Sequence, residues 1–295
     1  TITETFKEIW AARAELITEN LQRELYDTLT IDKKILEAME YSLLSEGKRL
    51  RPVLLMAAAD AISNNGEKFL PVACAVEMIH TYSLIHDDLP AMDNDDYRRG
   101  KLTNHKVFGD AMAILAGDAL LTLAFEVITR QKADPSILVE VIREISTAAG
   151  IAGMIGGQSV DIQSEGKKLN LIALRRMHLA KTGALFRASI RSGAILAGAS
   201  QEQLDALTQY ADNFGLAFQI TDDILDATGD EKKLGKSVGS DVRNKKSTYM
   251  TLMAPEEARI LAEMTVETAV DNLKVFGDEA NFLRELVEFL IKRDK

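Results

Sequence analysis

A buried helix that ends in acid constrains this chain more than any other feature. Residues 72–85 are apolar on nearly every side, and Pro71 stands at a plausible first position, which predicts a helix buried on all faces. The helix runs into Asp87 and Asp88, and Pro90 then disfavours further helix. Two carboxylates therefore lie at the negative end of a core helix, where the macrodipole opposes them.

A third acid and two arginines follow this helix end. Asp93 comes after a short turn that contains a proline, and Arg98 and Arg99 come soon after it. A divalent cation held by the three carboxylates would reverse the penalty of the helix dipole, and ligands that are all oxygen favour Mg²⁺ over zinc. The alternative interpretation is a solvated acidic loop.

A second stretch repeats this design. Residues 204–219 have helical periodicity and lead into Asp222, Asp223 and Asp226. Asp222 and Asp226 share one helix face, and Gln219 lies one turn earlier on that face. A single motif of this kind is a weak signal, because it can be a solvated helix end. Two of them, each ending an apolar helix with basic residues nearby, indicate a paired metal site.

The composition excludes several classes of protein. Of the 295 residues, 46% are hydrophobic, and the net charge of −10 argues against a nucleic-acid surface. The single cysteine, Cys74, lies within the buried helix, so we expect a core residue in a reducing cytoplasm. No stretch reaches the roughly 18 uninterrupted apolar residues of a membrane span, and we expect no stable membrane insertion. The first ten residues contain acids and lack the apolar centre of a secretory signal.

The periodicity is helical almost throughout, without a convincing alternating strand. The pattern predicts an all-α fold of about ten or more helices, with Ile9, Leu16, Leu21 and Leu25 facing inward in the first. No linker divides the chain, so we expect one domain over residues 1–295. The clearest helical segments are about 3–26, 32–45, 72–85, 111–128, 170–198, 204–219, 255–276 and 279–291.

Basic residues gather at three places. Lys48, Arg49 and Arg51 precede or enter a helix at Pro52, where free N–H groups attract anions; the alternative is a solvated basic turn. Lys181 and Thr182 lie inside a long helical segment capped by Asn170, and by themselves they prove nothing. Residues 228–248 are polar and rich in glycine and lysine, which is typical of a lid or binding loop.

These charges suit a diphosphate ligand. Carboxylates and a diphosphate, which carries about three negative charges, need several cations between them. The chain lacks the P-loop pattern of nucleotide triphosphatases and the signature of a nucleophilic triad. Leucine, isoleucine, alanine and tyrosine around the site indicate that the other end of the ligand is apolar.

Six motifs together resemble the trans-isoprenyl diphosphate synthases, most of all the bacterial members. They are GKRLRP at 47–52, the stretch 80–100, KTG at 181–183, the Phe-Gln pair at 218–219, DDILD at 222–226, and LGK at 234–236. The four residues between Asp88 and Asp93 match the longer bacterial form of the first acidic motif. The resemblance implies a single-domain isoprenoid-synthase bundle of helices around a central cavity, usually as a homodimer.

The resemblance also assigns roles residue by residue. Three Mg²⁺ ions would be held by Asp87, Asp88, Asp93, Asp222 and Asp226, with Asp223 between the last two. The diphosphate of the allylic substrate would be bound by Arg98, Lys181 and Lys236. Isopentenyl diphosphate would be bound by Gly47, Lys48, Arg51, His80 and Arg99. Lys181, Thr182 and Gln219 would stabilise the allylic carbocation.

The implied activity is Mg²⁺-dependent prenyl transfer. Isopentenyl diphosphate would be added to dimethylallyl and geranyl diphosphates by ionisation, condensation and elimination, giving (2E,6E)-farnesyl diphosphate with fifteen carbons. The resemblance makes Tyr82, five residues before Asp87, the floor of the product pocket; helical spacing alone does not place it there. The main alternative is a synthase of the twenty-carbon geranylgeranyl product. A terpene cyclase or a non-catalytic regulatory subunit fits less well.

Overall fold

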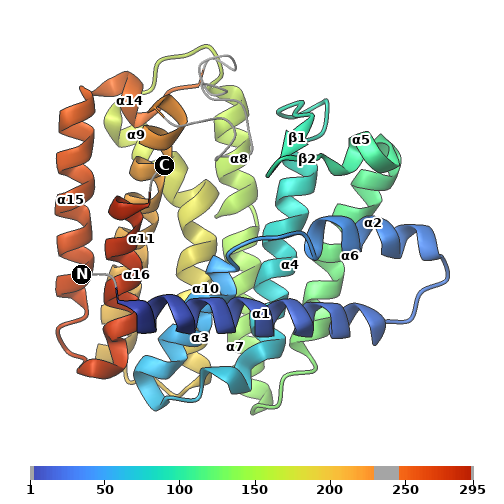
Figure 1. Ribbon diagram of the computed structural model, residues 1–295, viewed down its shortest axis with the longest axis horizontal. Helices are drawn as coiled ribbons and strands as arrows, with labels where there is room; N and C mark the ends of the chain where they lie inside the picture. Colours follow the sequence, from blue (N-terminus) through green and yellow to red (C-terminus); the bar gives the residue numbers. More distant parts are fainter. Residues whose placement is uncertain (1–2, 229–245, 294–295) are drawn as a thin grey trace.

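The computed structural model describes residues 3–228 and 246–293, and it confirms the all-α prediction (Figure 1). The first half contains α1 (Glu4–Tyr26), α2 (Lys33–Leu43), α3 (Leu50–Ser63), η1 (Gly66–Phe69), α4 (Leu70–Asp87), β1 (Tyr97–Arg98), β2 (Lys101–Leu102), α5 (Asn104–Phe108), α6 (Asp110–Ile128) and α7 (Pro135–Ala149). The second half contains α8 (Met154–Gln163), α9 (Leu171–His178), η2 (Leu179–Gly183), α10 (Ala184–Leu196), α11 (Gln201–Thr228), α14 (Tyr249–Leu252), α15 (Pro255–Asn272), η3 (Asp278–Ala280) and α16 (Asn281–Lys292).

Polar caps begin several of these helices where the sequence places them. The side chain of Asp32 accepts from the backbone N–H groups of Lys34 and Ile35 at the start of α2. Asn170 accepts from the backbone N–H of Ala173 at 2.8 Å and so begins α9, as predicted. Each cap satisfies a backbone donor that the first turn of a helix would leave without a partner.

Helix α4 forms the centre of the molecule. It packs against α6 on one side and α3 on the other, and α10 lies against α3. Its residues are buried on all faces from Val72 to Ile79, Cys74 included, and the helix ends at Asp87 as predicted. Figure 1 shows that the ends of α4 and α11 that carry acid open toward the same end of the bundle, at the top of the view.

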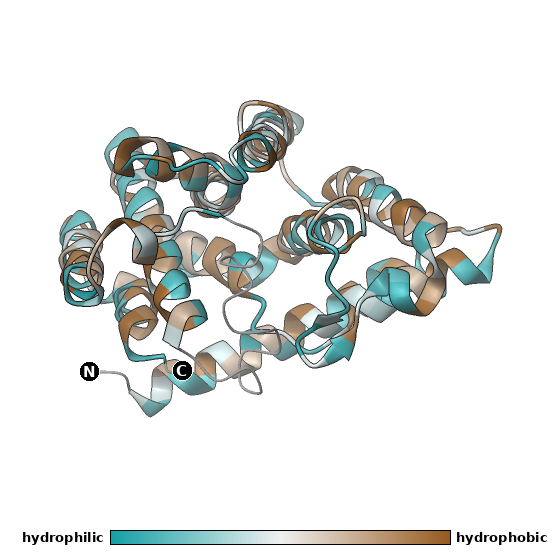
Figure 2. Cartoon of the chain, turned by 90° about the horizontal axis from the view of Figure 1, so that it is seen from above, coloured by the Kyte–Doolittle hydropathy of each residue, from teal (hydrophilic) through white to brown (hydrophobic). Residues whose placement is uncertain are grey.

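Three clusters of buried apolar side chains hold the bundle together. The largest joins α1, α2, α4, α6 and α7, and a second joins α3, α10, α11, α15 and α16. A small third cluster lies around Tyr249 between α9, α11 and α14. In Figure 2 the helices are seen from above, and most of them carry both hydrophobic and hydrophilic residues. The single-domain organisation over residues 1–295 stays a prediction.

The prediction of inward-facing residues in α1 is confirmed at three of the four positions. Leu21 and Leu25 are fully buried and Leu16 packs against the largest cluster, but Ile9 is 41% exposed. Ile9 was wrong because it lies about 120° around the helix from Leu21, whereas the buried residues Phe6 and Ile17 lie within about 60° of Leu21.

The described residues contain one short β-hairpin, whose two strands are only two residues long and so give no alternating pattern in the sequence. Tyr97 and Arg98 pair with Leu102 and Lys101, and the two turn residues, Arg99 and Gly100, have φ values of 50° and 75°. Positive φ at both central residues is typical of a type I′ turn, which commonly connects two antiparallel strands through two residues. The hairpin turns two successive arginines toward different neighbours, as described below.

The helix expected over residues 170–198 is interrupted. Residues 179–183 form a π-helical turn between α9 and α10, a form that often occurs at functional sites. Neighbouring helices approach this turn closely, because a Cβ on Gly157 of α8 would lie 2.6 Å from the Cα of Lys181. Gly157 therefore allows α8 to pack closely against this turn.

Helix α6 is long and apolar enough to cross a membrane by its length and composition, and no other helix in the described ranges meets that test. It packs along α4, and 44% of its apolar window is buried inside the protein. Leu115 of this helix remains 53% exposed.

Candidate functional site

A cavity of about 680 Å³ opens between α4, α6, α8 and the π-helical turn. Asp87, Gln158, Lys181 and Thr182 line it with polar groups. The other lining side chains are mostly apolar or aromatic, among them Tyr82, Leu89, Met92, Ile114, Met154, Ile155 and Leu185. The cavity can therefore hold a molecule with one charged and one apolar end, as the sequence suggested.

Asp87 lies on this cavity in an environment that disfavours its negative charge. Its Oδ1 accepts a hydrogen bond from Gln158 Nε2 at 3.0 Å. Burial, with repulsion from Asp93 and Asp88, raises the pKa of Asp87 to about 6, although Lys181 opposes the shift. A bound cation would relieve both burial and repulsion, so these residues fit a metal ion better than they fit an empty acidic turn.

Asp88 forms a buried ion pair with Arg98. It is only 3% exposed, and Arg98 Nε and Nη2 each donate to one of its oxygens at 2.8 Å. Burial raises the pKa of Asp88, and the hydrogen bonds from Arg98 counteract that effect. The structure thus pairs a predicted metal ligand with a predicted diphosphate contact.

Two lysines share one carboxylate beside the acidic turn. Asp161 Oδ2 lies 2.5 Å from Lys181 Nζ and 3.2 Å from Lys246 Nζ, and Lys246 also reaches Asp93 Oδ1 at 3.1 Å. Burial opposes ionisation of Asp161, but the two lysines lower its pKa. An ammonium group already bridges the first acidic motif to Asp161, which shows that this pocket accommodates positive charge.

Sequence reasoning missed Asp161, Gln158 and Lys246 as members of the site. Gln158 and Asp161 stand three residues apart, so they share a helix face. Two polar side chains on one face of an otherwise apolar and glycine-rich segment were the available signal. Lys246 belongs to the lysine-rich stretch 228–248, and nothing in the sequence sets it apart from the other lysines there. Lys236, predicted to bind the allylic diphosphate, lies outside the described residues.

The second acidic motif divides its carboxylates between two tasks. Asp223 is buried, accepts from Gln219 Nε2 at 2.8 Å and from the backbone N–H of Tyr249 at 2.9 Å, and so ties α11 to α14. The Asp222 side chain is 42% exposed and lies 3.7 Å from Arg293 Nη2. Asp226 is 5% exposed on the same helix face as Asp222.

Gln219 is held by its neighbour one turn along α11. Its Nε2 donates to Asp223 Oδ1 at 2.8 Å, and His178 lines the same small cavity as Gln219. A small cavity of about 60 Å³ connects Gln219 with Lys181 and Thr182 of the π-helical turn. Since Lys181 and Thr182 also line the larger cavity, these three residues lie around one point between the acidic motifs.

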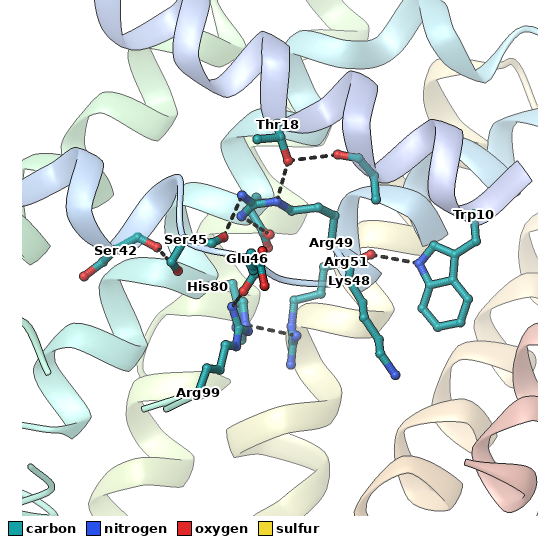
Figure 3. Close-up of polar contacts among 12 residues, drawn as sticks. Trp10, Thr18, Ser42, Ser45, Glu46, Lys48, Arg49, Arg51, His80 and Arg99 are labelled. Carbon is teal, nitrogen blue, oxygen red and sulfur yellow. Dashed lines mark hydrogen bonds and ion pairs between the residues drawn. The ribbon is translucent and has the colours of Figure 1, made fainter. Parts of the chain in front are cut away.

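Two of the cations predicted to bind isopentenyl diphosphate, Arg51 and Arg99, lie beside His80, whereas the Lys48 side chain is directed away from it (Figure 3). Arg51 is 9% exposed, and its guanidinium stacks on Phe186, with Cζ 4.3 Å from the ring centre. Its Nη1 lies 3.4 Å from His80 Nε2. Burial and the nearby Arg51 and Arg99 lower the pKa of His80 well below its usual value. His80 is therefore neutral and accepts from Arg51.

Gly47 and Lys48 complete this basic group. Arg99 Nη1 donates to the carbonyl of Glu46 at 3.0 Å, and a Cβ on Gly47 would lie 2.6 Å from that nitrogen. Lys48 Nζ lies 5.1 Å from the ring centre of Phe289. Arg49, in contrast, is buried against Glu77 at 3.0 Å, so it joins α3 to α4 and leaves the site to its neighbours.

The described residues do not gather three or more acidic, histidine or cysteine side chains closely enough to share one metal ion. The two acidic motifs instead lie at separate helix ends with lysines between them. Asp87 and Asp93 belong to the first, and Asp222 and Asp226 to the second, and all four offer the oxygen donors that Mg²⁺ prefers.

The comparisons with known proteins identify the family. Residues 32–276 match the model of the polyprenyl synthetase family, and the chain belongs to it. The chain is 48% identical to farnesyl diphosphate synthase of Geobacillus stearothermophilus, with 88% of this chain and 89% of that protein covered. It is 47% identical to geranylgeranyl diphosphate synthase of Cyanophora paradoxa, covering 88% of each.

A solved structure shares the fold over nearly the whole chain. The geranyltransferase of Helicobacter pylori, crystallised with magnesium and isoprenyl diphosphate, superimposes with a TM-score of 0.86 at 31% identity, covering 99% of this chain and 98% of that one. The resemblance seen in the sequence motifs is therefore confirmed, and the protein is a trans-prenyltransferase.

Proposed function

We propose that this enzyme joins isopentenyl diphosphate to dimethylallyl and geranyl diphosphates and releases farnesyl diphosphate. The observation that carries the proposal is a single cavity of about 680 Å³ with Asp87 and Lys181 among its polar lining residues and Tyr82 among its aromatic ones. Four relatives named farnesyl diphosphate synthase, 43% to 48% identical, support the same product.

The first proposed task of the protein is to hold the allylic diphosphate. Lys181 lies beside Asp87, and Lys246 contacts Asp93. With Mg²⁺ on the carboxylates, both ammonium groups can turn from Asp161 to the diphosphate oxygens, together with Arg98 and Lys236. Three ions would neutralise the combined charge; when bound, Mg²⁺ draws electrons from the diphosphate and so favours cleavage of the allylic C–O bond.

The second task is to stabilise the positive charge that cleavage creates. The Thr182 hydroxyl, the Lys181 carbonyl and the Gln219 carboxamide are dipoles on helical elements, and Gln219 is held by its hydrogen bond to Asp223. Dipoles that need no reorganisation stabilise charge efficiently in a site that excludes water. Lys181 and Thr182 belong to the π-helical turn. A continuous α-helix would direct their carbonyl and hydroxyl groups differently.

The third task is to orient isopentenyl diphosphate. Arg51 and Arg99 lie beside neutral His80, and Lys48 stands three residues before Arg51. Arg51 Nε has no hydrogen-bond partner among the described residues. A diphosphate would provide the missing acceptors. The double bond of isopentenyl diphosphate attacks the cation, and the departing diphosphate takes the proton that the new cation releases.

We propose further that the enzyme works as a homodimer in the cytoplasm. Leu115 on α6 is 53% exposed, and Val107 on the neighbouring helix α5 is 45% exposed. A second copy of the chain would bury this apolar surface. The one thiol, Cys74, is fully buried, which suits a reducing compartment.

Product analysis tests the main proposal. The enzyme is incubated with isopentenyl and dimethylallyl diphosphates with Mg²⁺ or with a chelator, and the hydrolysed products are separated by chain length. We expect the fifteen-carbon alcohol with Mg²⁺ and none with chelator. A twenty-carbon product would select the geranylgeranyl alternative, which the relative from Cyanophora paradoxa favours, and no elongation would refute prenyl transfer.

A further inference from the structure

Tyr82, the aromatic residue expected to limit product length, packs against the ring of His86. Tyr82 is 7% exposed, and its ring centre lies 5.3 Å from that of His86 with the planes at 83°. The two residues are four apart on α4, so they are neighbours on one helix face. An edge-to-face contact of this kind orients one ring by the other. Both rings line the product cavity.

His86 is itself fixed by the neighbouring helix. Its Nε2 lies 2.9 Å from the backbone carbonyl of Ile114 on α6. A carbonyl only accepts, so Nε2 carries the proton and donates. Asp118 Oδ1 lies further away, at 3.8 Å.

Gly117 makes room for that imidazole. A Cβ at position 117 would overlap His86 Nε2 and Cδ2, and it would lie 3.0 Å from Cε1. Any side chain at 117 must therefore push the ring off α6. Since His86 lines the cavity on its other side, the displaced ring moves toward Tyr82 and the space for product.

We propose that His86, seated on Gly117, is a positioning residue that holds the Tyr82 ring in place and thereby sets the length of the product. The proposal rests on the proposed prenyl transfer and deepens it. The floor of the cavity is then a unit of three residues on two helices, in which α6 takes part through a glycine and a backbone carbonyl.

Two single variants act in opposite directions on this unit. His86→Ala removes the support of Tyr82 and leaves space behind it, so we expect the ratio of twenty- to fifteen-carbon product to rise several-fold. Gly117→Ala drives the imidazole into the cavity, so we expect the ratio of fifteen- to ten-carbon product to fall several-fold. Ratios among products report only on active enzyme, so they do not change with the fraction of protein that folds.

The double variant distinguishes a steric seat from a general disturbance of α6. In the His86→Ala background the methyl group of Ala at 117 meets no imidazole, so Gly117→Ala should no longer shorten the product. Equal shortening with and without His86 would overturn the proposal, because the effect would not pass through the imidazole.

Further variants complete the test. His86→Gln keeps a donor for the Ile114 carbonyl but loses the ring, and we expect it to lengthen the product as His86→Ala does. Asp118→Asn removes only the distant charge and should leave the ratios unchanged; a shift as large as that of His86→Ala would show that charge, and not the glycine seat, holds the ring.

Tyr82→Ala separates failure of this proposal from failure of the proposed function. If Tyr82→Ala lengthens the product while His86→Ala and Gly117→Ala match the native ratios, the support by His86 is refuted and prenyl transfer stands. If the native enzyme elongates no substrate, the proposed function fails independently of any variant.

Discussion

Arg98 grips Asp88 with two hydrogen bonds of 2.8 Å, one from Nε and one from Nη2. This geometry needs the planar guanidinium, and a lysine can supply only one of the two contacts. The pair compensates a carboxylate that is 3% exposed at the negative end of α4. Arg98 therefore serves to keep Asp88 ionised as well as to meet a diphosphate.

Arg98→Lys should accordingly impair metal activation more than folding. With only one donor left, burial raises the pKa of Asp88 further, and we expect turnover to fall by about 10- to 100-fold. The Mg²⁺ concentration for half-maximal rate should rise as well. Titration of activity with Mg²⁺ measures both effects, and an unchanged Mg²⁺ requirement would show that Arg98 does not support the first acidic motif.

Asp161→Asn should damage both stability and catalysis. It leaves Lys181 and Lys246 without the carboxylate that they share, and breaking a buried ion pair costs about 3 kcal/mol. We expect a lower free energy of unfolding and a higher KM for geranyl diphosphate. Denaturant unfolding and steady-state kinetics measure these; Glu263→Gln, an exposed acid on α15, is the control. Native stability in Asp161→Asn would refute the shared ion pair.

The second acidic motif provides a paired test. Asp222→Ala should reduce turnover by orders of magnitude with little effect on the melting temperature, because the residue is half-exposed at the cavity end of α11. Asp223→Ala should lower the melting temperature as well, because Asp223 holds Gln219 and the backbone of Tyr249. Thermal unfolding beside activity tests the contrast, which fails if both variants melt alike.

Part of this site could be predicted from the sequence, because it depends on local patterns. The helix that ends at Asp87, the Asn170 cap and the basic entry to α3 follow from periodicity and from residues close in the chain. The contact of Lys246 with Asp93 joins residues 153 positions apart, and local periodicity carries no information about such a contact. The π-helical turn at Lys181 likewise depends on the close approach of Gly157 from another helix.

Arg51→Ala should affect one substrate more than the other. The side chain stacks on Phe186 and donates to His80, in the basic group assigned to isopentenyl diphosphate. We expect the KM for isopentenyl diphosphate to rise about tenfold or more, since a hydrogen bond to a charged group contributes roughly 1.5–3 kcal/mol. The KM for geranyl diphosphate should change less. Initial rates with each substrate varied in turn measure both values, and an equal rise would contradict the assignment.

The buried His178 should make stability depend on pH in mildly acidic solution. Burial, with repulsion from Lys181, lowers the pKa of His178 to about 4, below the value of about 6.5 in an unfolded chain. Between these values the unfolded state binds the proton and the folded state does not, so stability falls as the pH drops from about 6.5 to about 4. The full difference amounts to about 3 kcal/mol. Urea unfolding of the native enzyme and of His178→Phe across this range isolates the effect. The variant should show a shallower fall below pH 6.5, with a constant offset from the altered ring contact with Tyr249. Parallel curves for the two proteins would mean that His178 is protonated equally in both states.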